Sequence, residues 1–325
     1  MAHESVRTGA LALRAGAIDG FSGGPGRLAR LDLLGSLLSG RWLWTAPVVA
    51  GLLVLSIYPT IFLVALALSN SRLGRPFQSF AGLNNLLKAI LDPAFQAALT
   101  RSIAFAIAST AVELVLGVAV AVLMTRLVKA GRILMSLILL PLMTPPVMVA
   151  VAWKLILAPV GGLANGTLQK LGLIGEPLSF FGSAAGAWSS VGLADAWQWT
   201  PFVAILAYAA LLAYPKEIDE AAMLDGAGPW ARFRLLMLPF LAPSLVSIAL
   251  LKLVIGFKLF DLVFVLTYGG PGFETTTAAF HIWRLALEQF DAGRAAAETL
   301  IFALVVGLVT WPLTRWQHRL EAREA

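Results

Sequence analysis

The sequence predicts an all-α membrane protein with six transmembrane helices, both termini in the cytoplasm (N-in, C-in), and a short cytoplasmic helix between the fourth and fifth spans. Its composition is the first reason: 59% of the 325 residues are hydrophobic and 13% are charged, whereas soluble domains average about 45–50% apolar and about 25% charged residues. The apolar residues also form continuous runs of membrane-spanning length. Finally, Lys and Arg are distributed unevenly between alternate loops.

The runs are long enough to cross a bilayer, which takes about 20 mostly apolar residues in a helix. Backbone groups inside a bilayer must bond to one another, so we expect helices. Alternating hydrophobicity, the pattern of a β-barrel strand, is not evident. The six expected spans are residues 44–68, 103–124, 133–155, 188–212, 240–266 and 296–316.

The distribution of basic residues predicts the orientation. With the N-terminus inside, the cytoplasmic segments carry 14 of the 24 Lys and Arg residues and the outer segments carry 7. This is the bias expected of cytoplasmic loops. It also explains the net charge of +6, so we expect no nucleic-acid partner.

This orientation divides the chain into a cytoplasmic tail (residues 1–41), a transmembrane domain (residues 42–316) and a C-terminal cytoplasmic tail (residues 317–325). In the first tail, Leu28, Leu31, Leu34 and Leu38 share one helix face. Residues 27–38 are therefore either an amphipathic helix on the membrane surface or a loose linker interrupted at Gly35.

The connection between the fourth and fifth spans, residues 216–234, has the pattern of a docking element. Small alanines on one helix face permit close approach to a partner, and acidic residues near the helix start favour it through the helix dipole. Asp225-Gly226 then allows a turn with little strain. The alternative is a solvated connector. The residues expected at the contact are Asp219, Glu220, Ala221, Ala222, Asp225, Gly226, Arg232 and Arg234.

Two sequence blocks carry a resemblance to a known family. The first comprises Trp197, Pro201-Phe202, Pro215, Glu220-Ala221-Ala222, Asp225-Gly226-Ala227, Phe233-Arg234 and Leu238-Pro239. The second runs from Phe257 to Asp261 and continues to Tyr268-Gly269-Gly270-Pro271. Over residues 42–316 the chain resembles the sugar-type permease subunits of bacterial ABC importers, the family of the maltose and glycerol-3-phosphate permeases.

The resemblance implies a permease subunit in the bacterial cytoplasmic (inner) membrane. Its expected partners are two ATPase subunits, a second permease, a periplasmic or lipid-anchored solute-binding protein, and membrane lipid. The second block favours a different, rather than identical, second permease. ATP and Mg²⁺ would be bound by the ATPase, because the chain has no phosphate-binding G-x-x-x-x-G-K-[ST] motif. We therefore expect no enzyme activity and no cofactor in this chain.

The expected solute is a sugar or related polyol. The same architecture could instead carry an anionic sugar derivative, a phosphodiester or a polyamine. A more distant alternative is an ion-coupled secondary transporter, although the inverted repeats common in that class are not evident.

Polar residues within the spans are candidates for the solute path, because a charge at the bilayer centre costs about 2.5–3.5 kcal/mol. Tryptophan stacks on sugar rings, and Asp or Gln can bond hydroxyls. The candidates are Asp195, Trp197, Gln198, Trp199, Lys252, Lys258 and Asp261. Lys258 and Asp261 are expected to pair on one helix face. The alternatives are structural ion pairs, for Glu113 also, and tryptophans that anchor the helices at the membrane interface.

Two further expectations concern other features. Pro145-Pro146 predicts a broken or kinked third span. Gly269, Gly270 and Pro271 predict a tight outer turn that contacts the solute-binding protein. The chain has no cysteine and only three scattered histidines, so the sequence indicates no metal site.

Overall fold

The computed structural model describes residues 40–126 and 131–324. It consists of two compact units, Met1–Phe62 and Leu63–Ala325, with the boundary inside helix α2 (Gly40–Ala67). The predicted interfacial helix over residues 27–38 lies outside the described residues.

Helix α2 agrees with the first expected span. Its segment Thr45–Ala67 has a mean hydropathy of 2.4, and none of the most apolar stretch is buried. Leu55 and Ile61, for example, are exposed within the first unit. Lipid or another membrane protein is the environment that such a surface requires.

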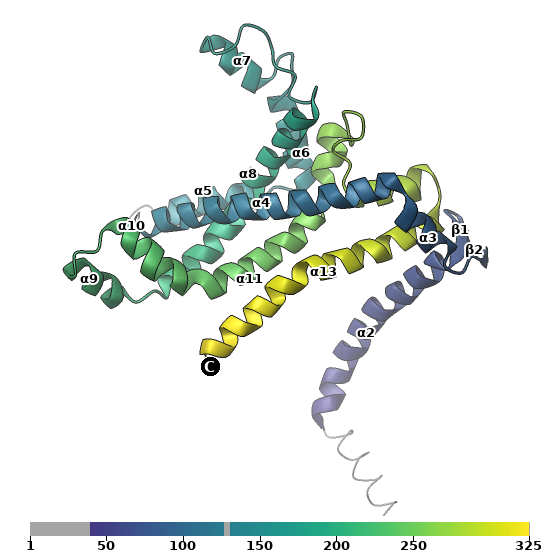
Figure 1. The fold of residues 1–325 in the computed structure, drawn as a ribbon, viewed down its shortest axis with the longest axis horizontal. Coiled ribbons are helices and arrows are strands. Elements are labelled where there is room, and N and C mark those ends of the chain that lie inside the picture. Colours follow the sequence, from purple (N-terminus) through teal and green to yellow (C-terminus); the bar gives the residue numbers. More distant parts are fainter. Residues whose placement is uncertain (1–39, 127–130, 325) are drawn as a thin grey trace, which may run out of the picture. The chain divides into compact units, whose positions relative to one another are not determined.

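Long helices build the second unit (Figure 1): α4 (Pro93–Arg126), α8 (Ala184–Leu212), α11 (Leu238–Phe257) and α13 (Ala292–Glu324). Helix α4 packs mainly against α8 and α11, and α11 packs against α13. Small side chains such as Ala121 and Ala207 share a core cluster with Val203 and Leu241. Such residues let membrane helices approach closely.

The third expected span is broken. Helices α5 (Gly131–Met143) and α6 (Pro146–Ile156) meet at an angle of 96°. A residue before proline is disfavoured in the helical region, and Pro145 accordingly is extended, with φ −56° and ψ 138°. The Pro-Pro pair therefore causes a break rather than a slight kink.

The fifth expected span is displaced along the sequence. The helical rod begins at Pro229 with α10 (Pro229–Arg232), passes through the π-helical turn η1 (Phe233–Met237) and ends with α11 at Phe257. A separate π-helical turn, η2 (Val263–Thr267), follows. Residues 240–257 of the expected span are therefore helical, but the expected continuation of one helix to residue 266 is wrong. A wide π turn before Pro239 accommodates a residue without a backbone N–H donor.

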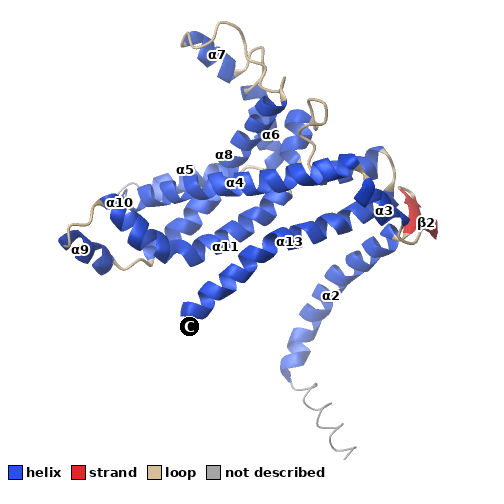
Figure 2. Cartoon of the chain, viewed as in Figure 1, coloured by secondary structure: helices blue, strands red, loops and turns tan. Residues whose placement is uncertain are grey.

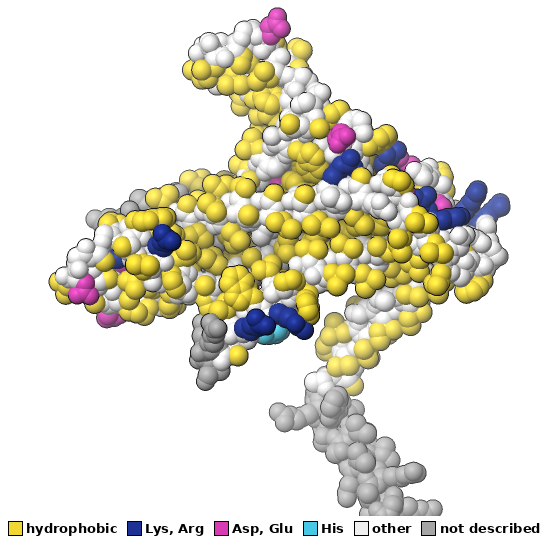
Figure 3. Space-filling view, viewed as in Figure 1, with side chains coloured by type: hydrophobic (Ala, Val, Ile, Leu, Met, Phe, Trp, Pro, Cys, Tyr) yellow, Lys and Arg dark blue, Asp and Glu magenta, His cyan; other side chains and the backbone are white. Residues whose placement is uncertain are grey.

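In the described residues, four helices are long and apolar enough to cross a membrane, or up to six if each of two bent helix pairs counts as one span. Figure 3 shows hydrophobic side chains along the flanks of the long helices, whereas charged side chains gather near the helix ends. The chain is therefore a multi-pass membrane protein.

One β-hairpin departs from the all-α prediction (Figure 2). Strands β1 (Ser69–Arg72) and β2 (Arg75–Phe80) are antiparallel, with Ser69 opposite Phe80. The Asn85 side chain, from α3 (Asn84–Leu91), donates to the backbone oxygens of Ala67 and Ser69 at 3.0 and 2.9 Å. The remaining elements are α7 (Leu163–Lys170), α9 (Lys216–Leu224), α12 (Ala278–Trp283) and the π-helical turn η3 (Arg284–Glu288).

Candidate functional site

Helix α9 lies at one end of the second unit, and α3 and the hairpin lie at the other (Figure 1). It follows α8 after a bend of 75°, and none of its residues is buried. Leu224 is 90% exposed and Trp230, in α10, is 69% exposed. Exposed apolar side chains on a charged, ordered helix are typical of a protein interaction surface.

The turn after α9 is tightly defined. The Ala227 N–H donates to the Ala222 carbonyl at 2.9 Å and the Gly226 N–H donates to the Met223 carbonyl at 3.1 Å. This is the pattern of a Schellman motif, which needs a left-handed residue after the helix. Gly226 supplies it with φ +79°. The predicted helix and Asp-Gly turn are therefore present, and the short helix α10 follows them.

An ion pair connects the two helices across this turn. Arg232 Nη1 in α10 donates to Asp219 Oδ2 in α9 at 2.6 Å, and the two side chains are 17% and 34% exposed. These two predicted contact residues thus bond to each other. Glu220, Ala221, Asp225 and Arg234 are exposed, whereas Ala222 is half-buried.

A triad of buried charges lies between the long helices. Lys252 of α11 donates to Asp195 of α8 at 3.2 Å, and it also forms an ion pair with Glu113 of α4 at 3.1 Å. Lys252 and Glu113 are fully buried, and Asp195 is 3% exposed. The Lys252 ammonium also lies 5.5 Å from the centre of the Trp199 ring. The triad therefore ties three helices together in a low-dielectric region.

The remaining path candidates on α8 have different surroundings. Gln198 is buried and donates to the Thr144 backbone oxygen, at the break between α5 and α6, at 3.0 Å. Trp197 is 45% exposed and lines an apolar cavity of about 400 Å³ together with Trp153 and Pro141. A second apolar cavity of about 650 Å³ lies between α4 and α8. Among the α8 candidates, Trp197 is exposed, Trp199 is half-buried, and Asp195 and Gln198 are buried.

The expected ion pair of Lys258 with Asp261 is absent from the described residues. Helix α11 ends at Phe257, and Lys258 is its exposed C-cap. Residues three apart meet only on a continuous helix. The break at residues 258–260 therefore places the two side chains apart.

The turn expected on the outer side is shaped by Gly269, which is buried with φ +81°. A Cβ atom there would lie 2.6 Å from Thr276 Oγ1, so the glycine is needed for the turn itself. Beside it, the exposed Tyr268 donates a hydrogen bond to Glu288. This bond raises the pKa of Tyr268 and lowers that of Glu288. Contact of Gly269, Gly270 and Pro271 with a binding protein stays a prediction.

The comparisons with known proteins agree with one another on a single family. Residues 113–324 match the model of the "binding-protein-dependent transport system inner membrane component" family. The trehalose/maltose transport system permease protein of Thermococcus litoralis is 30% identical over 269 residues, covering 82% of this chain and 89% of the relative. The lactose transport system permease protein of Rhizobium radiobacter is 27% identical, covering 83% and 91%.

A glycerol-3-phosphate transport system permease protein of Yersinia pestis is 30% identical over 228 residues, covering 70% of this chain and 76% of the relative. Among solved structures, a bacterial ABC transporter involved in the import of the acidic polysaccharide alginate matches with a TM-score of 0.72 at 19% identity. That match covers 90% of this chain and 98% of the other. The structural match shows a shared fold.

Proposed function

We propose that this chain, which belongs to the family of binding-protein-dependent transport system inner membrane components, forms half of a translocation path for a sugar or polyol. A second permease would supply the other half. Two ATPase subunits would bind ATP and Mg²⁺ and dock on α9, and a solute-binding protein would deliver the solute from outside. We place the protein in the bacterial cytoplasmic membrane with six spans, N-in and C-in.

The exposed, firmly capped α9 carries this proposal. A helix held by a Schellman turn and by the Asp219–Arg232 pair moves as one body with α10. Its apolar side chains Ile218, Met223 and Leu224 are 43%, 52% and 90% exposed. Seated in a groove of an ATPase, such a helix transmits a rotation of the ATPase to the span that begins in α10.

The buried triad favours a neutral solute over an anionic one. Lys252 is fully buried and faces two carboxylates, so its charge is not offered to a passing solute. The exposed Trp197 presents a ring that can stack on a sugar. We therefore retain Trp197 as the path residue on α8 and assign Asp195, Gln198 and Lys252 to helix contacts.

The test is uptake by proteoliposomes that contain the complete importer. Addition of the solute-binding protein with labelled sugar outside and ATP inside is expected to give uptake, and a non-hydrolysable ATP analogue is expected to give none. Uptake by this chain alone, driven by an ion gradient without ATP, would instead support the secondary-transporter alternative.

The α9 contact is tested separately in the same importer. A single cysteine placed at Leu224 should crosslink to an ATPase subunit, whereas one at Val160, in the loop after α6, should not. Failure of Leu224→Cys to crosslink under any nucleotide condition would contradict docking through α9.

A further inference from the structure

A second group of ionisable side chains lies in the second unit, next to the C-terminal end of α3. Asp92 follows α3, His281 belongs to α12, and Glu298 belongs to α13. The Glu298 side chain is fully buried, and those of Asp92 and His281 are 17% and 15% exposed. The three residues come from separate parts of the sequence, and none of them has a role in the function proposed above.

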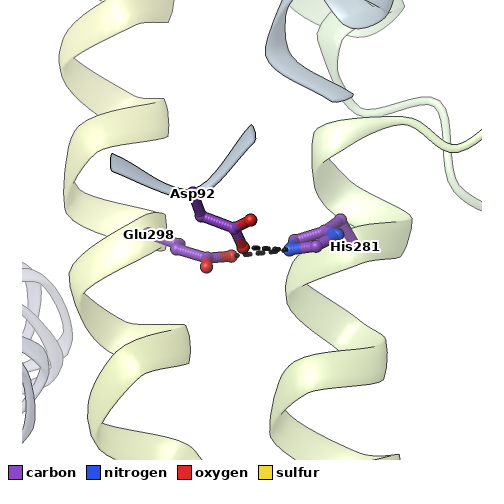
Figure 4. Close-up of side chains that lie close together, drawn as sticks. All are labelled: Asp92, His281 and Glu298. Atoms are coloured by element: carbon purple, nitrogen blue, oxygen red, sulfur yellow. Dashed lines mark ion pairs between the residues drawn. The ribbon is translucent and has the colours of Figure 1, made fainter. Parts of the chain in front are cut away.

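The three side chains point toward one another (Figure 4). His281 Nε2 lies 3.4 Å from Glu298 Oε2 and 3.7 Å from Asp92 Oδ2. Among the described residues, neither His281 Nε2 nor either Glu298 oxygen has a hydrogen-bond partner. A buried carboxylate without directed bonds is costly. A cation between these atoms would give His281 Nε2 and Glu298 the partner that they lack, whereas Asp92 already accepts from the Ala94 N–H and from Arg294.

We propose that Asp92, His281 and Glu298 bind a transition-metal dication of the zinc class. Zinc binds His nitrogen and carboxylate oxygen at about 2.0–2.2 Å in a tetrahedral arrangement, which separates neighbouring ligand atoms by about 3.3–3.6 Å. The observed separations of 3.4 and 3.7 Å fit this geometry, and the three ligand atoms all lie within 4.8 Å of one another. Water completes the fourth position.

Arg294 supports the ligands. Its Nη2 donates to Asp92 Oδ2, and its Nε lies 3.3 Å from Glu298 Oε1. Partners of this kind orient ligating carboxylates in known metal sites. Two carboxylates and one guanidinium leave a net charge of −1, which attracts a dication.

The site is also accessible. Asp92 and Arg294 line an open cavity of about 540 Å³ together with Asn84 and Lys88 of α3. A bound metal would connect the start of α4, α12 and α13. It would therefore act as a structural clamp at the end of the unit remote from α9.

The experiment uses the full-length chain, purified without a histidine tag, stripped with a chelator and reconstituted in lipid nanodiscs. Titration with Zn²⁺ alone is expected to show one site and a rise in the thermal unfolding midpoint. Mg²⁺ is expected to give neither, because it prefers oxygen ligands in octahedral geometry. His281→Ala and Glu298→Gln should each weaken Zn²⁺ binding by more than the 10–100-fold typical of an outer-sphere partner.

His318→Ala is the matched control, since His318 is on α13 but outside the cluster, and it should bind Zn²⁺ as the unmodified chain does. Should a variant fail to fold, X-ray absorption of the zinc-loaded unmodified chain still tests the site: one imidazole and oxygen ligands are expected. No Zn²⁺ binding by the unmodified chain, or equal binding by His281→Ala, would overturn the proposal and leave a proton on His281 Nε2 between the carboxylates.

Discussion

At the scale of single residues, Lys252 has the largest predicted energetic role. Lys252→Met keeps the side-chain size but leaves Glu113 and Asp195 buried without a countercharge. Breaking a buried ion pair in this way costs about 3–5 kcal/mol. We expect a markedly lower thermal unfolding midpoint in nanodiscs.

Two companions of Lys252→Met separate charge from packing. Adding Glu113→Gln and Asp195→Asn removes the unpaired charges and should recover most of the lost stability. Lys258→Met is the matched control, because the exposed Lys258 forms no ion pair among the described residues. Surface changes of this kind stay within about 0.5 kcal/mol. Equal destabilisation by Lys252→Met and Lys258→Met would show that the triad adds no stability.

Gly226 leads to a prediction about transport rather than folding. Gly226→Val forces a β-branched residue into φ +79°, at a cost of about 1–2 kcal/mol, although the space around the position is open. The helices should remain folded while α9 loses its orientation and ATP-driven uptake is abolished. Gly226→Asn should keep uptake, because Asn tolerates this conformation. Normal uptake by Gly226→Val would refute the role of the turn.

The sequence predicted some interactions of single residues and missed others. The separation of the interacting residues along the chain explains the difference. The Asp225-Gly226 turn is a local pattern, and the structure contains it. Lys252 meets Glu113 and Asp195 only after three helices pack. The sequence therefore marked each charge as exceptional without revealing its partner.

At the scale of elements, the pairing of α9 with α10 is expected to matter more for coupling than for stability. Asp219→Arg and Arg232→Asp each break the ion pair. Because the pair is partly exposed, the loss of stability should stay within about 1 kcal/mol. Uptake should nevertheless fall, and the double variant should regain part of it. Without such recovery, the two residues would have to act through separate contacts.

Helix boundaries show where pattern reasoning succeeds. Pro145-Pro146 predicted an interruption because proline restricts the residue before it, and a 96° break is present. Helix α11 instead ends at Phe257, inside the expected span of residues 240–266, which is mostly apolar on both sides of Lys258 and Asp261. Hydropathy does not distinguish a helix from an apolar turn. Likewise the hairpin of residues 69–80 is too short and polar to give a strand pattern.

At the scale of the whole molecule, composition was sufficient for the class of protein. Long apolar runs require helices in a bilayer irrespective of detail, and the described residues contain four to six candidate spans. Orientation rests on the distribution of Lys and Arg alone. Orientation relative to the membrane is therefore tested by an experiment of its own.

The natural absence of cysteine makes that experiment direct. Leu224→Cys and Val160→Cys place single thiols at positions that are 90% and 89% exposed, so both should react readily in detergent. In right-side-out vesicles, a membrane-impermeant maleimide should label Val160→Cys at once and Leu224→Cys only after permeabilisation. The reason is that the positive-inside rule places the loop of α9 in the cytoplasm. Labelling of Leu224→Cys in sealed vesicles would reverse the orientation and remove α9 from reach of a cytoplasmic ATPase.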